Sequence, residues 1–237
     1  MDALLHPPIT FAHRGARSRG RDNTLDTFRL ALDLGASGLE SDAWLTEDGV
    51  VVLDHDGVVR RGRAGLRREA IAGIPRTLLP PHIPSLEDLY DSCGTSFELS
   101  LDIKDPHAAP AVVAIARGLE GALPRLWLCS PSWEQTAEWR QLSEDVRLVD
   151  STRLRKIKEG PERRAAVLAD KGIDAVNLHH TDWTGGLTTL FHRFERLALG
   201  WDCQHERVLA ALLGMGIDGV YSDDVETMVD VLNAFLR

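Results

Sequence analysis

The stretch that decides the fold is FAHRGARSRGRDNTLDTFRLALDLGASGLESDAWLTEDGVVVLDHD, residues 11–56. Two short apolar runs in it each end at a histidine, His13 and His55, and an acidic pair, Glu40 and Asp42, lies between them. The pair falls in a predicted strand, where residues two apart point to the same face. Two carboxylates side by side on an inward face are unfavourable unless a cation or a proton neutralises them. The pair therefore indicates a site with chemistry.

The same stretch predicts a strand, a helix and a hairpin in succession. Apolar residues at helical spacing follow two polar residues, Asp22 and Asn23, either of which can cap the helix. The acidic turn Glu47-Asp48-Gly49 between two apolar runs is a strong hairpin signal. The expected elements are a strand at 9–13, a helix at 24–34, a strand at 38–45 and a returning strand at 50–55.

Beyond residue 56 the pattern is first irregular and then regular. Residues 57–84 are rich in Arg, Gly and Pro, with a charged piece at 60–68, and we expect them to form an excursion at one end of the fold, without a core of their own. After residue 85 strand-like and helix-like runs alternate. Expected helices are 85–93, 108–119, 132–141, 162–171, 186–194, 206–215 and 225–236; expected strands are 97–104, 125–129, 146–149, 175–178, 197–202 and 219–221.

Eight strand-then-helix units predict an α/β fold, a (β/α)8 barrel with a short hairpin and loop excursion after the second strand. The chain has 237 residues, close to the roughly 250 that are typical of one such barrel, so we expect a single domain over residues 1–237.

Polar residues recur at or just after the carboxyl ends of the predicted strands. In a barrel these ends share one rim, where active sites are built. Residues far apart in the sequence therefore become neighbours. The rim residues are His13, Glu40, Asp42, Asp102, Lys104, Ser130, Asn177, Trp201, Asp202 and Asp223.

Glu40, Asp42 and Asp102 offer three carboxylates from two strands. Ligands that are all oxygen suit a hard divalent cation, Mg²⁺ or Ca²⁺, better than zinc. Taken singly, each acid is equally consistent with a surface residue or a salt-bridge partner. The spacing of the first two favours a metal site.

Two histidines and two cations complete the predicted site. His13 and His55, each beside a charged neighbour, suit one proton donor and one acceptor near neutral pH. Arg14 presents a fork that matches a phosphoryl group, and Lys104 is a movable point charge, unless it only pairs with a nearby aspartate. Together with a metal, such groups hold a phosphodiester and protonate its leaving alkoxide.

Composition excludes several other classes of protein. The net charge of −9 argues against binding to nucleic acid, and the absence of a long apolar stretch argues against stable membrane insertion. The three cysteines form no C-x-x-C pair, and Cys129 and Cys203 lie in apolar runs typical of buried thiols. With no leader in MDALLHPPIT, we expect a cytoplasmic protein.

These motifs resemble the glycerophosphodiester phosphodiesterase family. That family carries His-Arg-Gly, Pro-Glu-Asn-Thr, Glu-x-Asp, Thr-x-Asp-Gly and His-Asp in this order. The corresponding segments here are 13–15, 22–24, 40–42, 46–49 and 55–56, and residues 216–223 resemble the family's last strand. The resemblance spans the whole chain and is densest in the first quarter.

The resemblance implies a TIM barrel that cleaves a glycerol-type phosphodiester to sn-glycerol 3-phosphate and an alcohol. It implies that Glu40, Asp42 and Asp102 are metal ligands and that His13 and His55 are the acid and the base. It further implies that Arg14 and Lys104 bind phosphate and that Trp201 shapes the alcohol pocket. The attacking oxygen comes from water or from a neighbouring substrate hydroxyl.

The chain departs from the family pattern at two positions. Arg21-Asp22 replaces Pro-Glu, and Asp102 stands where Glu is common, which places a metal about one methylene nearer that strand or leaves room for a water. Asp at the latter position resembles the sphingomyelinase D enzymes, which lack the Asn-Thr segment and are secreted with disulfides. The alternatives are thus lysophospholipase D-like or sphingomyelinase D-like cleavage of a lipid phosphodiester, or an inactive barrel that serves as a binding module. An apolar patch beside the rim would favour a lipid substrate, but the candidates, residues 78–81 and Trp183, are better explained by ordinary packing.

Overall fold

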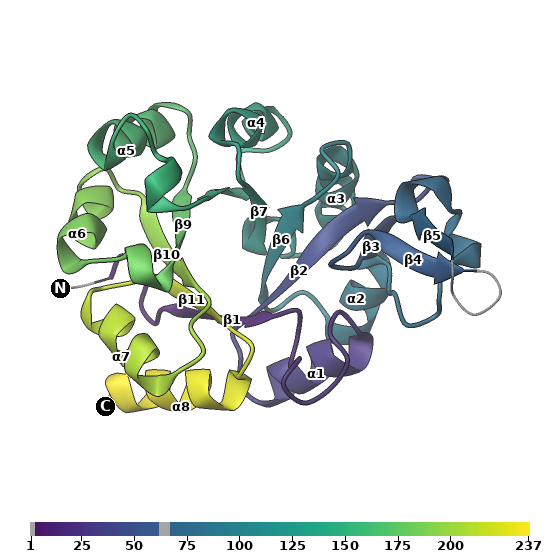
Figure 1. Cartoon of the computed structure of the whole chain (residues 1–237), viewed down its shortest axis with the longest axis horizontal. Coiled ribbons are helices and arrows are strands. Elements are labelled where there is room, and N and C mark those ends of the chain that lie inside the picture. Colours follow the sequence, from purple (N-terminus) through teal and green to yellow (C-terminus); the bar gives the residue numbers. More distant parts are fainter. Residues whose placement is uncertain (1–2, 62–66) are drawn as a thin grey trace.

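The computed structural model, which describes residues 3–61 and 67–237, is a closed barrel of eight parallel strands surrounded by helices (Figure 1). The ring closes because the first strand pairs with both the second and the last. The predicted (β/α)8 barrel is confirmed. Its strands are β1 (Ile9–His13), β2 (Gly38–Leu45), β6 (Glu98–Ile103), β7 (Leu126–Ser130), β8 (Arg147–Ser151), β9 (Ala175–His179), β10 (Leu197–Trp201) and β11 (Gly219–Ser222).

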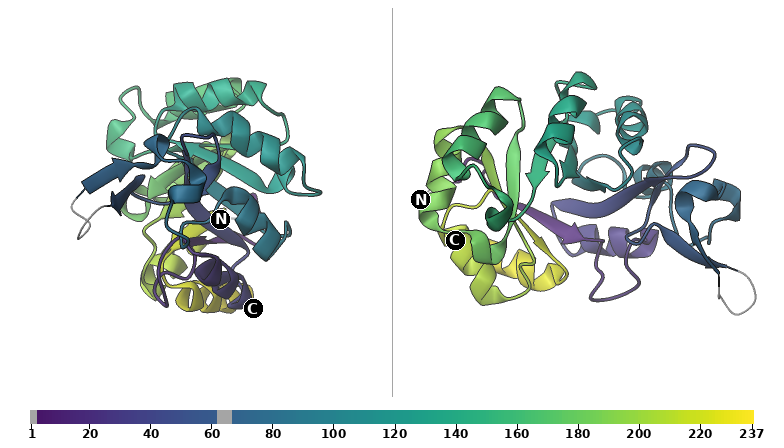
Figure 2. Two further views of the ribbon diagram at one scale, coloured as in Figure 1. Left: turned by 90° about the vertical axis from the view of Figure 1, so that its right-hand side faces the viewer. Right: turned by 45° about the horizontal axis from the view of Figure 1, so that its top comes forward.

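The helices pack around the outside of this ring, as two further views show (Figure 2). Their bounds differ from the predicted ones by one to three residues, and the largest difference is at α4, whose last turn, Trp139–Gln141, is 3₁₀ rather than α. They are α1 (Leu25–Asp33), α2 (Leu86–Cys93), α3 (Ala108–Arg117), α4 (Trp133–Glu138), α5 (Pro161–Asp170), α6 (Gly185–Arg193), α7 (Glu206–Gly214) and α8 (Val225–Phe235). Short 3₁₀ turns lie at Leu123–Arg125, Trp139–Gln141, Leu154–Lys156 and His180–Asp182.

The cap of α1 corrects one prediction. Thr24, rather than Asp22 or Asn23, caps the helix, and it forms a reciprocal capping box with Thr27. Asn23 has a left-handed backbone with φ 52°, and its side chain accepts a hydrogen bond of 2.7 Å from Ser41 on β2. The asparagine is used to tie the first loop to the barrel and is unavailable as a cap.

Aromatic side chains fill the barrel interior. Phe11 stacks on Tyr221 at a centroid distance of 4.6 Å and meets Trp127 edge-on at 5.8 Å. Gly38 on the neighbouring strand makes room for them, since a Cβ there would come within 2.7 Å of the Phe11 ring. These rings therefore fill the barrel beneath the rim.

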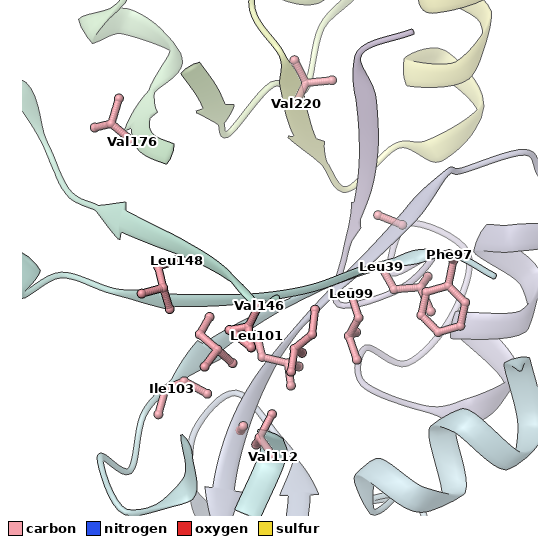
Figure 3. Close-up of a cluster of buried hydrophobic side chains, with 14 of the residues drawn as sticks. Leu39, Phe97, Leu99, Leu101, Ile103, Val112, Val146, Leu148, Val176 and Val220 are labelled. Atoms are coloured by element: carbon pink, nitrogen blue, oxygen red, sulfur yellow. The ribbon is translucent and has the colours of Figure 1, made fainter. Parts of the chain in front are cut away.

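A second, larger core separates the barrel from its helices. Leucines and valines that point outward from the strands pack against the inner faces of the helices, as Figure 3 shows for β6 and its neighbours. Each such side chain, when fully buried, stabilises the fold by about 1.5–3 kcal/mol. The rim is thus built on a rigid support.

The excursion after β2 is more ordered than predicted. β3 (Val51–Leu53) pairs antiparallel with β2, which confirms the hairpin, and β4 (Val58–Arg61) pairs with β5 (Arg67–Ala70). Two 3₁₀ turns follow, Ile71–Gly73 and Arg76–Leu78. Part of the charged piece at 60–68 lies outside the described residues.

The excursion also shares a small core with the β2–β3 hairpin, which the sequence reading missed. Six side chains are buried in it: Val52, Val59, Ile71, Ile74, Leu79 and Ile83. Trp44 packs on this core and donates a hydrogen bond of 2.8 Å to the Asp54 carbonyl. Gly57, with φ +65°, lies so close to the Trp44 ring that a Cβ would come within 2.4 Å. The segment that carries His55 is therefore packed firmly against the hairpin.

The cysteines agree with the expectation of buried thiols. All three are free, and Cys129 and Cys203 are buried. Within residues 3–61 and 67–237, the helices are too short or too polar to cross a bilayer.

Candidate active site

Alternate residues along a strand face the barrel interior, and this spacing brings the site residues to the rim. Ile9 and Phe11 face the interior of the barrel, and the next inward residue of β1 is His13 at its carboxyl end. Tyr221 faces inward on β11, and Asp223 follows at the same spacing. On these two strands the inward positions are thus apolar low in the barrel and polar at the rim.

Three carboxylates meet at this rim. Register sets Asp42 on β2 directly beside Asp102 on β6, with Glu40 one layer below them. One oxygen from each lies within 4.8 Å of the other two. Glu40 and Asp42 are 5% and 2% exposed. The predicted carboxylate trio, Glu40, Asp42 and Asp102, is therefore brought together.

Two basic residues, Lys104 and Arg14, pair with the trio on its open side. The Lys104 Nζ lies 3.0 Å from Asp42 Oδ1 and 3.0 Å from Asp102 Oδ2, so the lysine bridges both acids. The Arg14 Nε lies 3.8 Å from Asp42 Oδ2, and the Arg14 backbone N–H donates to Glu40 Oε2 at 3.0 Å. All five predicted ligand and phosphate-binding residues form one network.

Burial governs the protonation of the trio. Burial raises the pKa of Glu40 to about 8, against the opposing charge of His13, and it also raises the pKa of Asp42. For Lys104 burial acts in the other direction, but Asp102 and Asp42 outweigh it and raise the lysine pKa. The raised pKa values of Glu40 and Asp42 show that the two basic residues only partly offset the burial of these carboxylates.

The trio fits a hard divalent cation. Within the described residues, Asp42 Oδ2 and Arg14 Nε are buried without a hydrogen-bond partner. A buried carboxylate oxygen normally has a partner, and a metal ion supplies one. Three carboxylates with no nitrogen or sulfur donor match Mg²⁺ or Ca²⁺.

His13 is fixed at both ring nitrogens. Its Nδ1–H donates to Asp223 Oδ1 at 2.6 Å, and its Nε2 points toward Glu40, 3.7 Å from Oε2. Burial alone would lower the pKa of His13, but Glu40 and the Asp223 hydrogen bond outweigh it and raise the pKa above its usual value. His13 is thus oriented over the trio.

A tight turn follows His13. Arg14 and Gly15 both have left-handed backbones, with φ 56° and 78°. A Cβ on Gly15 would come within 2.9 Å of the Thr27 backbone, so glycine is needed where the turn touches α1. The His-Arg-Gly sequence is therefore a geometric device that directs Arg14 back over Asp42.

His55 lies farther out. It follows β3, its side chain is 43% exposed, and its Nδ1–H donates to Asp56 Oδ1 at 2.8 Å. Unlike His13, it is absent from the lining of the cleft described next.

A cleft of about 640 Å³ opens over the trio. His13, Arg14, Glu40, Asp102 and Trp201 line it, and Trp201 lies on β10 across the mouth from the trio. A larger hollow of about 1180 Å³ lies outside the barrel between α1 and residues 76–88, and none of the predicted site residues lines it. Charge and burial, not volume, mark the site.

The apolar residues suggested for lipid contact are mostly core residues. Leu79 and Trp183 are 6% and 4% exposed, and Trp183 donates a hydrogen bond to the Leu199 carbonyl. Leu78 is 54% exposed, but it lies in the excursion. They form no joint patch beside the cleft.

Several cleft residues were missed as site residues. Asp223 was placed on the rim, but its bond to His13 depends on barrel closure, which local sequence does not reveal. A second set of three possible ligands, His179, His180 and Asp202, also lies at the rim. Further cleft residues follow β8 and have no motif signal, because charges there look like solvated surface: Arg153, Arg155 and Lys156.

Comparison with known proteins gives a consistent picture. The model of the "Glycerophosphoryl diester phosphodiesterase family" matches residues 13–227. The "Glycerophosphodiester phosphodiesterase" of Caldanaerobacter subterraneus is 24% identical, over 94% of this chain and 97% of that protein. The "Probable glycerophosphodiester phosphodiesterase 2" of Mycobacterium tuberculosis is 28% identical, over 95% and 91%.

Solved structures share the fold. A putative glycerophosphoryl diester phosphodiesterase from Silicibacter pomeroyi superposes with a TM-score of 0.83 at 21% identity, covering 97% of this chain and 95% of that one. A phosphodiesterase from Oleispira antarctica, solved in complex with the product sn-glycerol-3-phosphate, superposes with a TM-score of 0.80 at 19% identity, over 95% and 97%.

Proposed function

Because the chain belongs to the glycerophosphoryl diester phosphodiesterase family, and is therefore a phosphoric diester hydrolase, we propose that it hydrolyses glycerophosphodiesters to sn-glycerol 3-phosphate and an alcohol with a divalent cation. The observation that carries this proposal is the carboxylate trio beneath His13, of which Glu40 and Asp42 are buried and Asp102 is half-buried. The product complex of the Oleispira antarctica relative supports the choice of product.

We assign Glu40, Asp42 and Asp102 to holding the cation, Mg²⁺ or Ca²⁺. When bound, this ion supplies positive charge that the two basic residues alone do not provide. Arg14 and Lys104, already within 4 Å of Asp42, are placed to bind the phosphoryl oxygens on the open side.

The two histidines move the protons. Asp223 holds the Nδ1 proton of His13, so the Nε2 of that ring is the atom that exchanges a proton with substrate. Asp56 holds the Nδ1 proton of His55 in the same way, and His55 transfers its proton from the outer side of the rim. One imidazole takes a proton from the attacking oxygen and the other gives one to the leaving alkoxide.

Two further assignments complete the proposal. Trp201 lines the cleft opposite the trio and shapes the space for the alcohol. The free, buried Cys129 and Cys203 are consistent with a reducing compartment such as the cytoplasm.

The test is to replace each histidine by alanine and follow release of glycerol 3-phosphate from glycerophosphocholine with Mg²⁺ or Ca²⁺. We expect His13→Ala and His55→Ala each to lower kcat by about 10²–10⁴-fold, the usual contribution of a proton-transfer group. His6→Ala is the matched control, because His6 is exposed at the opposite end of the barrel.

Undiminished turnover in both site variants would reject the mechanism. Substrates in solution and in micelles separate the proposed reaction from cleavage of a lipid phosphodiester, which would be faster on micelles. Failure of the wild type to bind either cation would favour the inactive barrel instead.

A further inference from the structure

The loop after β8 brings three cations to the mouth of the cleft. Arg153, Arg155 and Lys156 line it together with the end of the strand. In the ring of eight strands, β8 lies four places from β1 in either direction. The loop therefore stands across the mouth from His13 and Arg14, and two to three strands away from the trio on β2 and β6.

Two of these cations are not neutralised. Arg153 pairs with Asp182 at 2.7 Å, but Arg155 and Lys156 have no carboxylate partner within residues 3–61 and 67–237. The nearest acid in sequence, Glu159, is occupied by Arg164 at 2.6 Å. In a chain with a net charge of −9, unpaired positive charge at the cleft needs an explanation.

The loop is also held in place. The Asp182 carboxylate accepts from the Leu154 backbone N–H at 3.1 Å as well as from the Arg153 guanidinium. Ile157 is buried in the large core just beyond the cations. A loop fixed at both sides of Arg155 and Lys156 presents their charges at a set position, so less entropy is lost when an anion binds.

We propose that the alcohol released by this enzyme carries a second phosphate, which Arg155 and Lys156 bind. The inference rests on the proposed function: once the diester phosphate lies over the trio, the alcohol extends across the mouth toward the β8 loop. A guanidinium binds a phosphate through two parallel hydrogen bonds, and an ammonium adds a point charge. The preferred substrates are therefore glycerophosphodiesters of a phosphorylated alcohol.

The part of the cleft around Trp201 is poorly suited to a cationic alcohol such as choline. Quaternary ammonium groups bind on open aromatic faces. The aromatic residue at the mouth, Trp201, already has the Arg153 guanidinium 5.6 Å from its ring centre and the His179 ring at 4.5 Å. A second cation there would meet repulsion from Arg153, Arg155 and Lys156.

The experiment compares two substrates that differ by one phosphate, glycerophosphoinositol and glycerophosphoinositol 4-phosphate. We expect wild-type kcat/KM to be about 10–100-fold higher for the phosphorylated substrate, the usual range for one or two hydrogen bonds to a charged group. The double variant Arg155→Gln/Lys156→Gln should lose most of this preference, because its kcat/KM should fall much more for the phosphorylated substrate than for glycerophosphoinositol. The control Arg163→Gln/Lys171→Gln removes the same charge from α5 outside the cleft and should keep the preference.

Two results would overturn the inference. One is a wild type without preference for the phosphorylated substrate, and the other is a preference that survives in Arg155→Gln/Lys156→Gln. In either case turnover of glycerophosphocholine would leave the proposed function standing. Absence of turnover on every glycerophosphodiester would remove the proposed function and this inference together.

Discussion

Asp223 is the side chain on which the orientation of His13 depends. Its carboxylate holds the Nδ1 proton at 2.6 Å, and Arg17 lies 3.6 Å from the same oxygen. Burial would raise the pKa of Asp223, but the bond to His13 outweighs it and lowers the pKa, so the carboxylate stays charged. We infer that Asp223 positions His13 through this bond.

We expect Asp223→Asn to lower kcat by roughly 10²-fold or more, since a poorly oriented or wrongly protonated imidazole transfers protons slowly. The loss of the carboxylate also removes a contribution that raises the His13 pKa. The limb of the pH–rate profile that reports His13 should therefore move to lower pH. Steady-state kinetics from pH 5 to 9 would measure both effects.

Asp105→Asn is the matched control, because Asp105 also pairs with a histidine, the exposed His107 at 3.1 Å. The pH–rate profile of Asp105→Asn should match that of the wild type. A profile that is also unmoved in Asp223→Asn would show that the aspartate has no part in positioning His13.

At this scale the sequence was most informative where residues recur with the period of a strand. Glu40 and Asp42 could be assigned to one face from spacing alone, and Asp102 joined them once the barrel was assumed. The role of Arg155 and Lys156 could not be predicted. A charged loop residue is recognised as unpaired, and as part of the cleft, only when its neighbours in space are known.

At the scale of elements, a buried ion pair joins β8 to α5. The Arg164 Nη1 lies 2.6 Å from Asp150 Oδ2, and Asp150 is fully buried. The other carboxylate oxygen of Asp150 has no hydrogen-bond partner within the part of the chain that the structure describes. Burial therefore raises the Asp150 pKa to about 6, in spite of the arginine. This pair lies at the base of the loop that carries Arg155 and Lys156.

The pair makes stability depend on pH. Because the folded-state pKa of Asp150 lies above its unfolded value, its stabilising contribution is complete below about pH 4 and is lost as the pH rises through about 6. We expect the free energy of unfolding of the wild type, relative to Asp150→Asn, to fall by up to about 3 kcal/mol between pH 4 and pH 7. Urea unfolding at both pH values measures this difference.

Asp170→Asn serves as the comparison, since Asp170 is an exposed residue of α5 paired with Lys171. Its stability relative to wild type should not change with pH in this way. If the wild type and Asp150→Asn kept a constant difference from pH 4 to pH 7, the assigned burial effect on Asp150 would be wrong.

Elements with a clear period were predicted within a few residues, and the excursion was not. Residues 57–84 looked irregular because Gly, Pro and Arg interrupt every short apolar run. Their order comes from Trp44 and Val52 of the neighbouring hairpin, which complete a core that the segment lacks alone. Packing between segments, rather than local propensity, decided this structure.

At the scale of the whole molecule, Glu40 and Asp42 link folding to pH, because burial disfavours their charged forms. Burial of Glu40 raises its pKa to about 8, so without a metal its contribution to stability is lost as the pH rises through that value. A cation that binds only the folded chain reverses this loss and stabilises the entire barrel.

We therefore expect saturating Mg²⁺ or Ca²⁺ to raise the melting temperature. At a concentration 100 times Kd the gain is about 2.7 kcal/mol, which corresponds to roughly 5–10 °C for a domain of this size. The shift should be larger at pH 8.5 than at pH 6, because protons compete with the metal at low pH. Thermal denaturation with chelator and with each cation measures it.

Asp102→Asn should lose most of the shift, whereas Asp26→Asn, which changes an acid with 89% of its side chain exposed, should keep it. Equal melting temperatures for wild-type protein with chelator and with either cation would contradict the metal assignment.

The architecture was predictable because the strand and helix signals repeat eight times, and one closed ring accommodates that repeat. How deep in the barrel the site lies could not be predicted, because this depends on how Phe11, Trp127 and Tyr221 fill the lower barrel. Those contacts join strands that are widely separated in the sequence.

The bond between His13 and Asp223 joins residues that are 210 positions apart. Asp223 directly follows β11, the strand that closes the ring against β1. The bond therefore forms only when the two ends of the sheet meet, and the orientation of His13 reports on closure of the barrel.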